Sequence, residues 1–201
     1  ILSTIETYNV RHMFGSPALL HRIAPAALAA PGRISSLKTV VCGGAAAPVQ
    51  LLQNFRKALP DDSQIHTTYG ATEALPIATV ELNTLLEGCA EQTHQGKGVC
   101  VGKPLKHIQA RIIQISNDPQ PQWQENLLTE GDQVGEVILR GPVVSQAYHN
   151  NPLADQQHKI AEDGTVWHRT GDVGTLDKEG RLWLCGRKTE TVWTENGPLF
   201  T

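Results

Sequence analysis

The stretch Ile65-His66-Thr67-Thr68-Tyr69-Gly70-Ala71-Thr72-Glu73 decides how the rest of the chain is interpreted. It begins as a β-type segment, breaks at a glycine, and then places a hydroxyl beside a carboxylate, at Thr72 and Glu73. Strand ends of this kind carry binding sites in open α/β sheets. A threonine hydroxyl can donate to a phosphate oxygen, and a glutamate can hold Mg²⁺, which prefers oxygen ligands. The alternative is an ordinary turn in which Thr72 caps a helix and Glu73 is solvated.

A strand, a turn of small residues and a helix precede this stretch. The nearly continuous apolar run Leu37–Cys42 suits a strand that is covered on both faces. Gly43-Gly44-Ala45-Ala46-Ala47-Pro48 follows it, and then a helix through Leu51 to Leu59. This order is typical of a βαβ unit, so the Gly43 turn and the Thr72–Glu73 turn should open on the same edge of a parallel sheet. Small residues let a flat ligand such as a purine approach closely, although tight packing alone explains the turn about as well.

The first thirty residues predict one more strand and helix. Val10 to Phe14 can form a short strand. Ser16 and Pro17 then give a good helix start, as N-cap and first helical residue. We expect Pro25 to interrupt this helix.

From Gly96 onward the sequence changes to short extended runs separated by glycine and proline. These runs are 99–101, 108–115, 134–139, 166–168 and 182–184. Such spacing favours a small antiparallel or barrel-like unit. Residues 117–131 are polar and contain proline, which predicts a surface excursion, and a short helix is expected from Pro152 to His158. The predicted fold class is therefore α/β: a parallel sheet with flanking helices, followed by a small antiparallel β-barrel-like subdomain.

A second candidate site lies in Trp167-His168-Arg169-Thr170-Gly171-Asp172. An aspartate just past a glycine in a turn can accept two hydrogen bonds from vicinal hydroxyls, as a ribose presents them. The alternative is an aspartate that binds its own turn backbone. Further along, Arg187 can reach a phosphate or ribose oxygen, and a surface salt bridge is an equally common role for an arginine.

Composition excludes several classes of protein. The 201 residues fit one large domain or two small ones, and the formal net charge of −3, without a basic stripe, argues against a nucleic-acid partner. The four cysteines are scattered, which predicts reduced thiols in a cytosolic protein and no zinc site. No apolar run approaches the roughly 18 residues of a membrane helix, and the N-terminus lacks a signal pattern.

Four of these segments, in this order, resemble the signatures of the adenylate-forming superfamily, which contains acyl-CoA synthetases, luciferases and the adenylation domains of peptide synthetases. The signatures are a small-residue adenine loop, a Tyr-Gly-x-Thr-Glu motif, a Thr-Gly-Asp motif and a Gly-Arg segment before a hinge. Here they read Gly43-Gly44-Ala45, Tyr69-Gly70-Ala71-Thr72-Glu73, Thr170-Gly171-Asp172 and Gly186-Arg187. The resemblance covers nearly the whole chain.

The resemblance implies part of the large N-terminal domain of such an enzyme. Residues 1–95 would form an α/β adenine- and acyl-binding subdomain. Residues 96–188 would form the β-rich, barrel-like subdomain that carries the ribose-binding aspartate. Residues 189–201 would be the hinge and the start of a C-terminal lid.

It also implies a role for each matching residue. The nucleotide-binding positions would be Gly43, Gly44, Ala45, Tyr69, Gly70, Thr72, Asp172 and Arg187. Thr72 would meet the α-phosphate and Glu73 the Mg²⁺, as the catalytic pair. Asp172 would bind the ribose hydroxyls and Arg187 the ribose-phosphate side. Ala71 and Leu75 would border the acyl pocket, and we expect the Gly43 loop, Thr72 with Glu73, and Asp172 to surround a single AMP-sized cleft.

The implied reaction is the attack of a substrate carboxylate on the α-phosphorus of ATP, which gives an acyl-adenylate and pyrophosphate. Residues 69–76, 96–104 and 180–188 are also similar to the bacterial β-lactone synthetases of long-chain olefin biosynthesis, which activate a β-hydroxy acid so that its own hydroxyl closes the ring. The alternatives are a fatty-acid-CoA ligase or a peptide synthetase adenylation domain. An alternative of another class is an inactive scaffold or an interaction module.

Two departures from the superfamily pattern stand out. Its phosphate loop would lie before Ile1 and its lid, with the catalytic lysine, beyond Thr201. We therefore expect a fragment that is inactive without the remaining parts of the same polypeptide. In addition, Thr189 stands where relatives that swing the lid have Asp or Lys. This weakens the case for CoA as a second substrate without excluding it, because many residues tolerate the torsions of a hinge.

Overall fold

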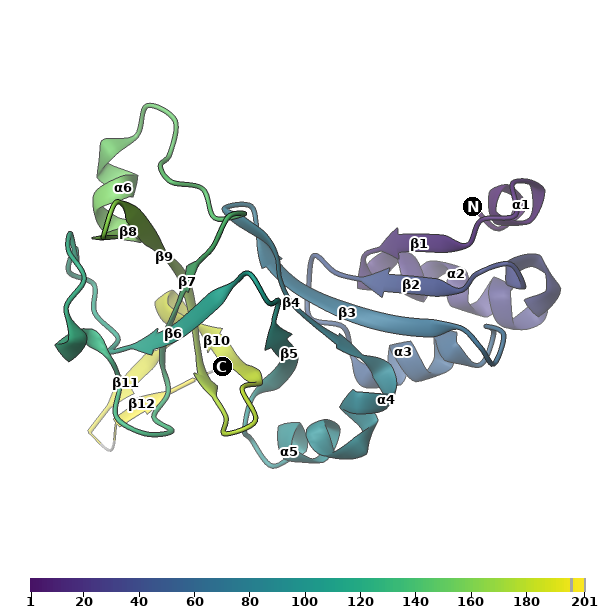
Figure 1. Cartoon of the computed structure of the whole chain (residues 1–201). Helices are drawn as coiled ribbons and strands as arrows, with labels where there is room; N and C mark the ends of the chain where they lie inside the picture. The colour runs from purple at the N-terminus through teal and green to yellow at the C-terminus, as the bar shows by residue number, and fades with distance from the viewer. Residues whose placement is uncertain (196, 201) are drawn as a thin grey trace. The chain divides into compact units, whose positions relative to one another are not determined.

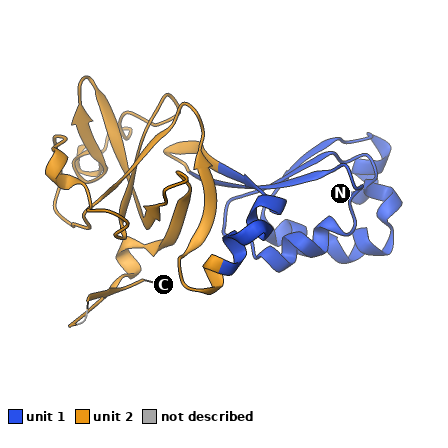
Figure 2. Ribbon diagram, turned by 60° about the horizontal axis from the view of Figure 1, so that its bottom comes forward, with its two compact units in different colours: residues 1–70, 79–91 blue, residues 71–78, 92–201 orange. Residues whose placement is uncertain are grey.

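The computed structural model describes residues 1–195 and 197–200 (Figure 1). It divides into two compact units, which Figure 2 shows in different colours. Unit 1 comprises residues 1–70 and 79–91, and unit 2 comprises residues 71–78 and 92–201. Within the predicted hinge segment 189–201, residues 196 and 201 lie outside the described residues.

Unit 1 is built on short parallel strands and helices. The strands are β1 (His12–Gly15), β2 (Thr39–Cys42) and β3 (Gln64–Ala71). The helical elements are α1 (Leu2–Thr7), α2 (Pro17–Ala29), η1 (Pro31–Ile34), α3 (Val49–Arg56), α4 (Leu82–Thr84), η2 (Leu85–Cys89) and α5 (Ala90–His94), whose last residues belong to unit 2. β2 pairs in parallel with β1 and with β3, which confirms the parallel arrangement predicted for this part of the chain.

Helix α2 begins as predicted and ends later than predicted. The Ser16 side chain accepts a hydrogen bond from the Leu19 amide at 3.2 Å, as an N-cap does. The expectation that Pro25 interrupts the helix is wrong, since α2 continues to Ala29. Leu20 and Ala27, on either side of the proline, are both fully buried. Packing of this apolar face offsets the backbone hydrogen bond that the proline removes.

Helix α3 packs its apolar face and ends sooner than the predicted Leu59. Leu52 and Phe55 are fully buried, and α2 and α3 lie on the same side of the three strands (Figure 1). Arg56 ends the helix because its guanidinium donates to the carbonyls of Leu59, Pro60 and Asp61, at 3.2, 2.9 and 2.8 Å. An arginine at this position satisfies carbonyl groups of the turn that follows a helix.

Unit 2 is built mainly from antiparallel strands. They are the first part of β4 (Ala74–Glu81), β5 (Val99–Pro104), β6 (Gln109–Ile113), β7 (Gly135–Arg140), β8 (Lys159–Glu162), β9 (Thr165–Leu176) and β10 (Leu182–Arg187), with the hairpin of β11 (Val192–Thr194) and β12 (Gly197–Leu199). The helical elements are η3 (Glu125–Leu127), α6 (Pro152–His158) and η4 (Lys188–Glu190). Helix α6 has the predicted bounds. No residue of the predicted excursion 117–131 is buried.

The predicted barrel is replaced by an open sheet. Its strands follow the order β5-β10-β9-β7-β6, with β8 also on β9, and the pairings along this path are antiparallel. Among the described residues, no pairing joins the end strands β5 and β6, so the sheet does not close. Strand β9 is 12 residues long, and β8 and β10 pair with its first and second parts.

Strand β9 contains a β-bulge where a turn was predicted. Glu136 is opposite Val173 and Ile138 is opposite Arg169, so three residues of β9 stand against Val137. These three residues, 170–172, are the Thr-Gly-Asp motif, and its glycine has a φ of +71°. A bulge inserts extra residues into a strand and redirects the side chains that follow. The motif is therefore presented from within a sheet rather than from a loop.

Both units bury clusters of apolar side chains, and the four cysteines are free. In unit 2, a cluster of Ile113, Ile138, Ile160 and Trp167 is almost fully buried, and the ring of Trp123 lies 5.7 Å from that of Trp167. The four cysteines form no disulfide, and three of them are buried.

The backbone after β2 approaches its neighbours closely at Gly43. A Cβ atom there would lie 2.6 Å from the Thr68 side chain and 3.3 Å from the Phe14 ring. Gly43→Ala should therefore overpack unit 1 and lower the free energy of unfolding by about 1–3 kcal/mol. Urea denaturation measures this change.

Gly32→Ala is the matched control, because a Cβ at Gly32 would meet no atom within 4 Å. It should leave the unfolding midpoint nearly unchanged. Equal midpoints for the two variants would show that close packing does not fix Gly43.

Candidate functional site

In unit 1, the residues predicted for adenine lie at the carboxyl ends of two parallel strands. Cys42 pairs in register with Thr67, so Gly43 stands beside Thr68 and one residue short of the level of Tyr69. Tyr69 is half-buried, whereas Gly44, Ala45 and Gly70 are exposed. The close contacts at Gly43 support tight packing as the reason for this glycine. The exposed residues that follow it lie at the edge where open α/β sheets bind ligands.

In unit 2, Thr72 and Glu73 form the turn between β3 and β4. A strand follows them, so the alternative in which Thr72 caps a helix is wrong. Thr72 is exposed and Glu73 is half-buried. Of the two residues predicted for the acyl pocket, Ala71 ends β3 half-buried, and Leu75 in β4 is 57% exposed.

The Glu73 carboxylate has a partner that the sequence did not indicate. The Tyr148 hydroxyl donates to Oε1 of Glu73 at 2.6 Å, and the Ser145 amide donates to the Glu73 carbonyl at 2.8 Å. Lys159, which is almost fully buried, donates from Nζ to the Ser145 carbonyl at 2.6 Å. The same Nζ lies 3.4 Å from Nδ1 of His168. Contacts thus link residues from four parts of the sequence to Glu73, and Tyr148 is the one that binds its carboxylate.

The protonation of this cluster follows from burial and hydrogen bonding. The hydrogen bond from Tyr148 holds the pKa of Glu73 below its usual value, although burial opposes this shift. Burial, followed by the hydrogen bond to Glu73, raises the pKa of Tyr148. Burial lowers the pKa of Lys159. Burial, together with the nearby Lys159 charge, lowers the pKa of His168 to about 4, so this imidazole is neutral at pH 7.

The bulge of β9 brings Asp172 and Arg187 together. Arg187 is opposite Asp172 on β10, and its Nη1 lies 2.6 Å from Oδ1 of that carboxylate. The Asp172 amide donates to the Thr170 hydroxyl at 3.0 Å, and that hydroxyl donates to the Val137 carbonyl at 2.9 Å. The Asp172 side chain is largely buried, while that of Arg187 is 54% exposed. The two proposed ribose-side residues are therefore direct neighbours.

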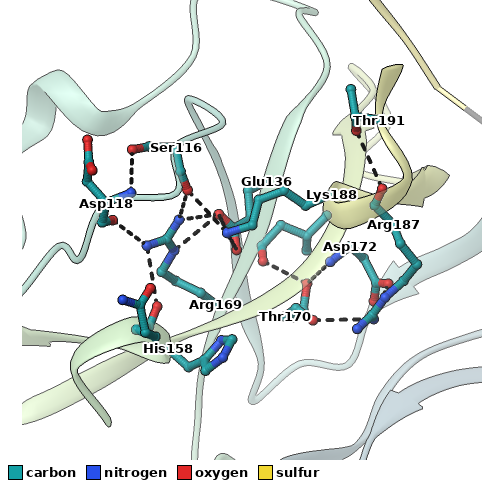
Figure 3. A network of polar contacts seen from close by, with 12 residues as sticks. Ser116, Asp118, Glu136, His158, Arg169, Thr170, Asp172, Arg187, Lys188 and Thr191 are labelled. Carbon is teal, nitrogen blue, oxygen red and sulfur yellow. Dashed lines mark hydrogen bonds and ion pairs between the residues drawn. The ribbon is translucent and has the colours of Figure 1, made fainter. Parts of the chain in front are cut away.

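A buried ionic network lies beside this pair (Figure 3). The Glu136 carboxylate is fully buried and accepts from Arg169, whose Nη2 is 2.6 Å away, and from Nζ of Lys188 at 3.1 Å. Arg169 also donates to the carbonyls of Ser116 and Asp118, at 2.5 and 2.9 Å. The predicted surface excursion 117–131 thus supplies one acceptor, the Asp118 carbonyl, for a buried guanidinium.

The sequence analysis did not single out Glu136, Arg169 or Lys188. One signal was available, because Glu136 is the only charged residue in the apolar run 134–139. A carboxylate inside a buried strand requires a cationic partner. The identity of that partner depends on strand pairing, which the sequence leaves open.

Strand β9 connects the two groups of polar residues in unit 2. His168, from the Glu73 cluster, lies four residues before Asp172 in this strand, a distance of about 13 Å or less along an extended chain. The single cleft that we expect would combine the Gly43 loop of unit 1 with residues of unit 2. This cleft stays a prediction.

The single carboxylate of Glu73 fits a magnesium ion that is bound chiefly through phosphate oxygens. Mg²⁺ in such sites uses one or two carboxylates together with phosphate oxygens and water. Glu73 supplies one carboxylate. Among residues 1–195 and 197–200, no group of three or more His, Cys, Asp or Glu side chains could hold a metal by itself. Within the same residues, no helix has the length and apolar character needed to cross a membrane.

Comparison with known proteins gives consistent matches. The family model described as AMP-binding enzyme matches residues 1–149. The chain is 41% identical over 203 residues to an olefin beta-lactone synthetase of Stenotrophomonas maltophilia. This alignment covers 98% of this chain and 36% of the relative. An olefin beta-lactone synthetase of Xanthomonas campestris pv. campestris is 39% identical over 199 residues, with 96% and 35% covered.

A solved structure shares the fold. O-succinylbenzoate coenzyme A synthetase from Bacillus subtilis, in complex with ATP and magnesium ion, matches with a TM-score of 0.74 and 23% identity. The match covers 99% of this chain and 36% of that one. This likeness confirms the α/β class. The chain spans about a third of the length of the curated relatives it matches.

Unit 2 should be sensitive to the loss of the Glu136 charge. Glu136→Gln would keep the shape of the side chain and leave the cations of Arg169 and Lys188 without a buried counter-charge. Breaking a buried ion pair in this way typically lowers the free energy of unfolding by about 3–5 kcal/mol. Urea denaturation measures it. Glu179→Gln is the control, since that carboxylate is 60% exposed in its ion pair with Arg181. A similar, small effect of both variants would contradict the stabilising role of the network.

Neutral His168 should make folding sensitive to acid. Its folded-state pKa of about 4 lies below the ordinary 6.5, so the unfolded chain takes up a proton first as the pH falls. The stabilisation of the folded state by the neutral imidazole is fully present above pH 6.5 and is lost as the pH falls towards 4. Between pH 7 and pH 5, the unfolding free energy of the wild type should drop by about 2 kcal/mol more than that of His168→Asn.

The measurement is a set of urea titrations at several pH values. His21→Asn is the control, because His21 is exposed on α2, and it should follow the wild type. If His168→Asn followed the wild type as well, His168 would not be the group that titrates.

Proposed function

Because the chain belongs to the AMP-binding enzyme family, we propose that it forms part of an ATP-dependent ligase that activates a carboxylic acid as an acyl-adenylate. The observation that carries this proposal is the arrangement in unit 2. The turn with Thr72 and Glu73 is linked through Ser145 and Lys159 to strand β9, and the bulge that carries Asp172, the partner of Arg187, lies in the same strand. Both belong to the motifs that the sequence shares with adenylate-forming enzymes.

In this reaction, an oxygen of the substrate carboxylate forms a bond to the α-phosphorus of ATP. The bond from that phosphorus to the oxygen of the β-phosphate breaks, and pyrophosphate leaves. A bound Mg²⁺ would offset negative charge on the phosphate oxygens. The demand on the protein is therefore positioning and charge stabilisation.

The residues of this chain fit those tasks. Glu73 would hold the cation through its carboxylate, and the exposed Thr72 hydroxyl would donate to an α-phosphate oxygen. Asp172 would accept hydrogen bonds from the ribose hydroxyls. Arg187 pairs with that carboxylate and still exposes about half of its side chain, so it can also meet the ribose-phosphate side. The roles of Gly43, Gly44, Ala45, Tyr69 and Gly70 at adenine, and of Ala71 and Leu75 at the acyl group, are part of the same proposal.

We extend the proposal to a long-chain β-hydroxy acid whose own hydroxyl attacks the acyl-adenylate carbonyl, closes a β-lactone and releases AMP. The likeness to two olefin beta-lactone synthetases over nearly the whole chain supports this choice. No CoA is consumed in such a reaction. The domain bounds 1–95, 96–188 and 189–201, and the cytosolic location, are kept as proposals.

The decisive experiment uses the full-length protein that contains these residues. It is incubated with ATP and Mg²⁺ and either a β-hydroxy acid alone or a plain fatty acid with CoA. We expect lactone, AMP and pyrophosphate from the first mixture and no thioester from the second. Thioester in the second mixture, without lactone in the first, would assign a fatty-acid-CoA ligase instead.

Asp172→Ala tests the nucleotide site. Loss of hydrogen bonds between a carboxylate and the ribose should weaken ATP binding roughly 10- to 100-fold, as calorimetry measures. Asp132→Ala is the control, because Asp132 is exposed. A protein that binds no ATP, and that Asp172→Ala leaves unchanged, would be a scaffold or interaction module.

A further inference from the structure

The loop between β7 and α6, residues 141–151, contacts Glu73 at two points and its neighbour Ala74 at a third. The Ser145 amide donates to the Glu73 carbonyl at 2.8 Å. Val144 forms an isolated antiparallel bridge with Ala74. The Tyr148 hydroxyl donates to Oε1 of Glu73 at 2.6 Å, across 75 residues of sequence. Both the backbone and the carboxylate of this motif residue are therefore fixed by a loop far away in the sequence.

The loop is itself fixed at both contact residues. Nζ of Lys159 donates to the Ser145 carbonyl at 2.6 Å and to its hydroxyl at 3.0 Å. The Tyr148 amide donates to Oδ1 of Asp155 at 2.8 Å. The Tyr148 ring lies 5.1 Å from the Lys159 ammonium and has an edge contact with His168, with ring centroids 6.5 Å apart. Its hydroxyl is thus held in place before any ligand binds.

The two carboxylate oxygens of Glu73 differ in their side-chain contacts. Oε1 accepts from Tyr148. Among the described residues, no other side chain donates a hydrogen bond to Oε2. A glutamate side chain has several rotatable bonds, and a short hydrogen bond to one oxygen fixes the plane in which the other lies. Carboxylates that bind metals are commonly oriented by such partners.

We infer that Tyr148 is a positioning residue: its hydroxyl, held by the loop that Lys159 and Asp155 fasten, orients the Glu73 carboxylate so that Oε2 faces the divalent cation of a bound nucleotide. The inference rests on the proposed function, because it takes Glu73 as the residue that meets the cation. Neither the family motifs in the sequence nor the named relatives assign a role to Tyr148.

The test separates metal coupling from general damage to the protein. Binding of α,β-methylene-ATP to the full-length protein is measured by calorimetry with and without Mn²⁺. The dissociation constant without Mn²⁺ divided by that with Mn²⁺ reports what the cation contributes to binding. Tyr148→Phe keeps the ring and removes only the hydroxyl. We expect this ratio to fall about 10-fold while the metal-free constant stays the same.

A double-mutant cycle shows whether Tyr148 acts through Glu73. In Glu73→Gln, the added Tyr148→Phe change should cause no further fall in the ratio, because the carboxylate that the hydroxyl orients is already gone. Tyr8→Phe is the matched control. It removes the same atom from a tyrosine that is 76% exposed in unit 1, and it should match the wild type.

Three outcomes would overturn the inference. Dissociation constants that match the wild type in Tyr148→Phe, both with and without Mn²⁺, would show that the hydroxyl does not position the carboxylate. Equal weakening with and without Mn²⁺ would show a structural role alone. A wild-type protein that binds no nucleotide would overturn the proposed function itself and this inference with it, whereas the first two outcomes leave the proposed function standing.

Discussion

A buried negative charge constrains the whole of unit 2. The Glu136 carboxylate has no exposure to solvent, and removing a charge from water is unfavourable unless cations and hydrogen bonds replace the lost solvation. Arg169 and Lys188 supply those cations. They can do so only if β7, β9 and the end of β10 keep one particular register. The same register places Asp172 opposite Arg187, so the requirement to neutralise Glu136 also sets the geometry of the proposed ribose site.

The Glu73 region is organised by a second group of polar contacts. Here no cationic side chain among the described residues pairs with the carboxylate, and the neutral Tyr148 hydroxyl is the donor. Lys159 and His168 lie behind this contact, away from water, with pKa values that burial lowers. The outcome is an anionic group that is fixed on one side. That is the property expected of a residue that must meet a hard cation without moving when it arrives.

Much of the fold was predictable because its signals are local. The Ser16 cap and the position of α6 each follow from the residues within a few positions. The parallel pairing of β2 and β3 follows from the order strand, helix, strand. The resemblance to adenylate-forming enzymes is likewise confirmed by the family match. The errors concern effects between distant segments. Packing of buried residues on both sides of Pro25 stabilises α2 beyond the proline. The strand pairings of unit 2 give an open sheet instead of the predicted barrel.

The candidate site shows the same contrast between local signals and contacts with distant segments. Glu73, Asp172 and Arg187 stood out because they belong to recognisable motifs. Tyr148, Lys159 and the Glu136 network did not, because their importance comes from partners 14 to 75 residues away. The Thr-Gly-Asp segment was placed in a turn because glycine commonly marks one. A mid-strand bulge uses the same residue types, and only the pairing with β7 distinguishes the two.

The neighbours Arg187 and Lys188 bind separate carboxylates, one largely buried and one completely so. This double attachment holds the chain where strand β10 ends. Backbone rotations at Thr189 or beyond would therefore swing the following residues about a stationary pivot. Such a rotation would leave Asp172 and its partner in place, so the proposed ribose site would keep its geometry while the segment after Lys188 changes direction.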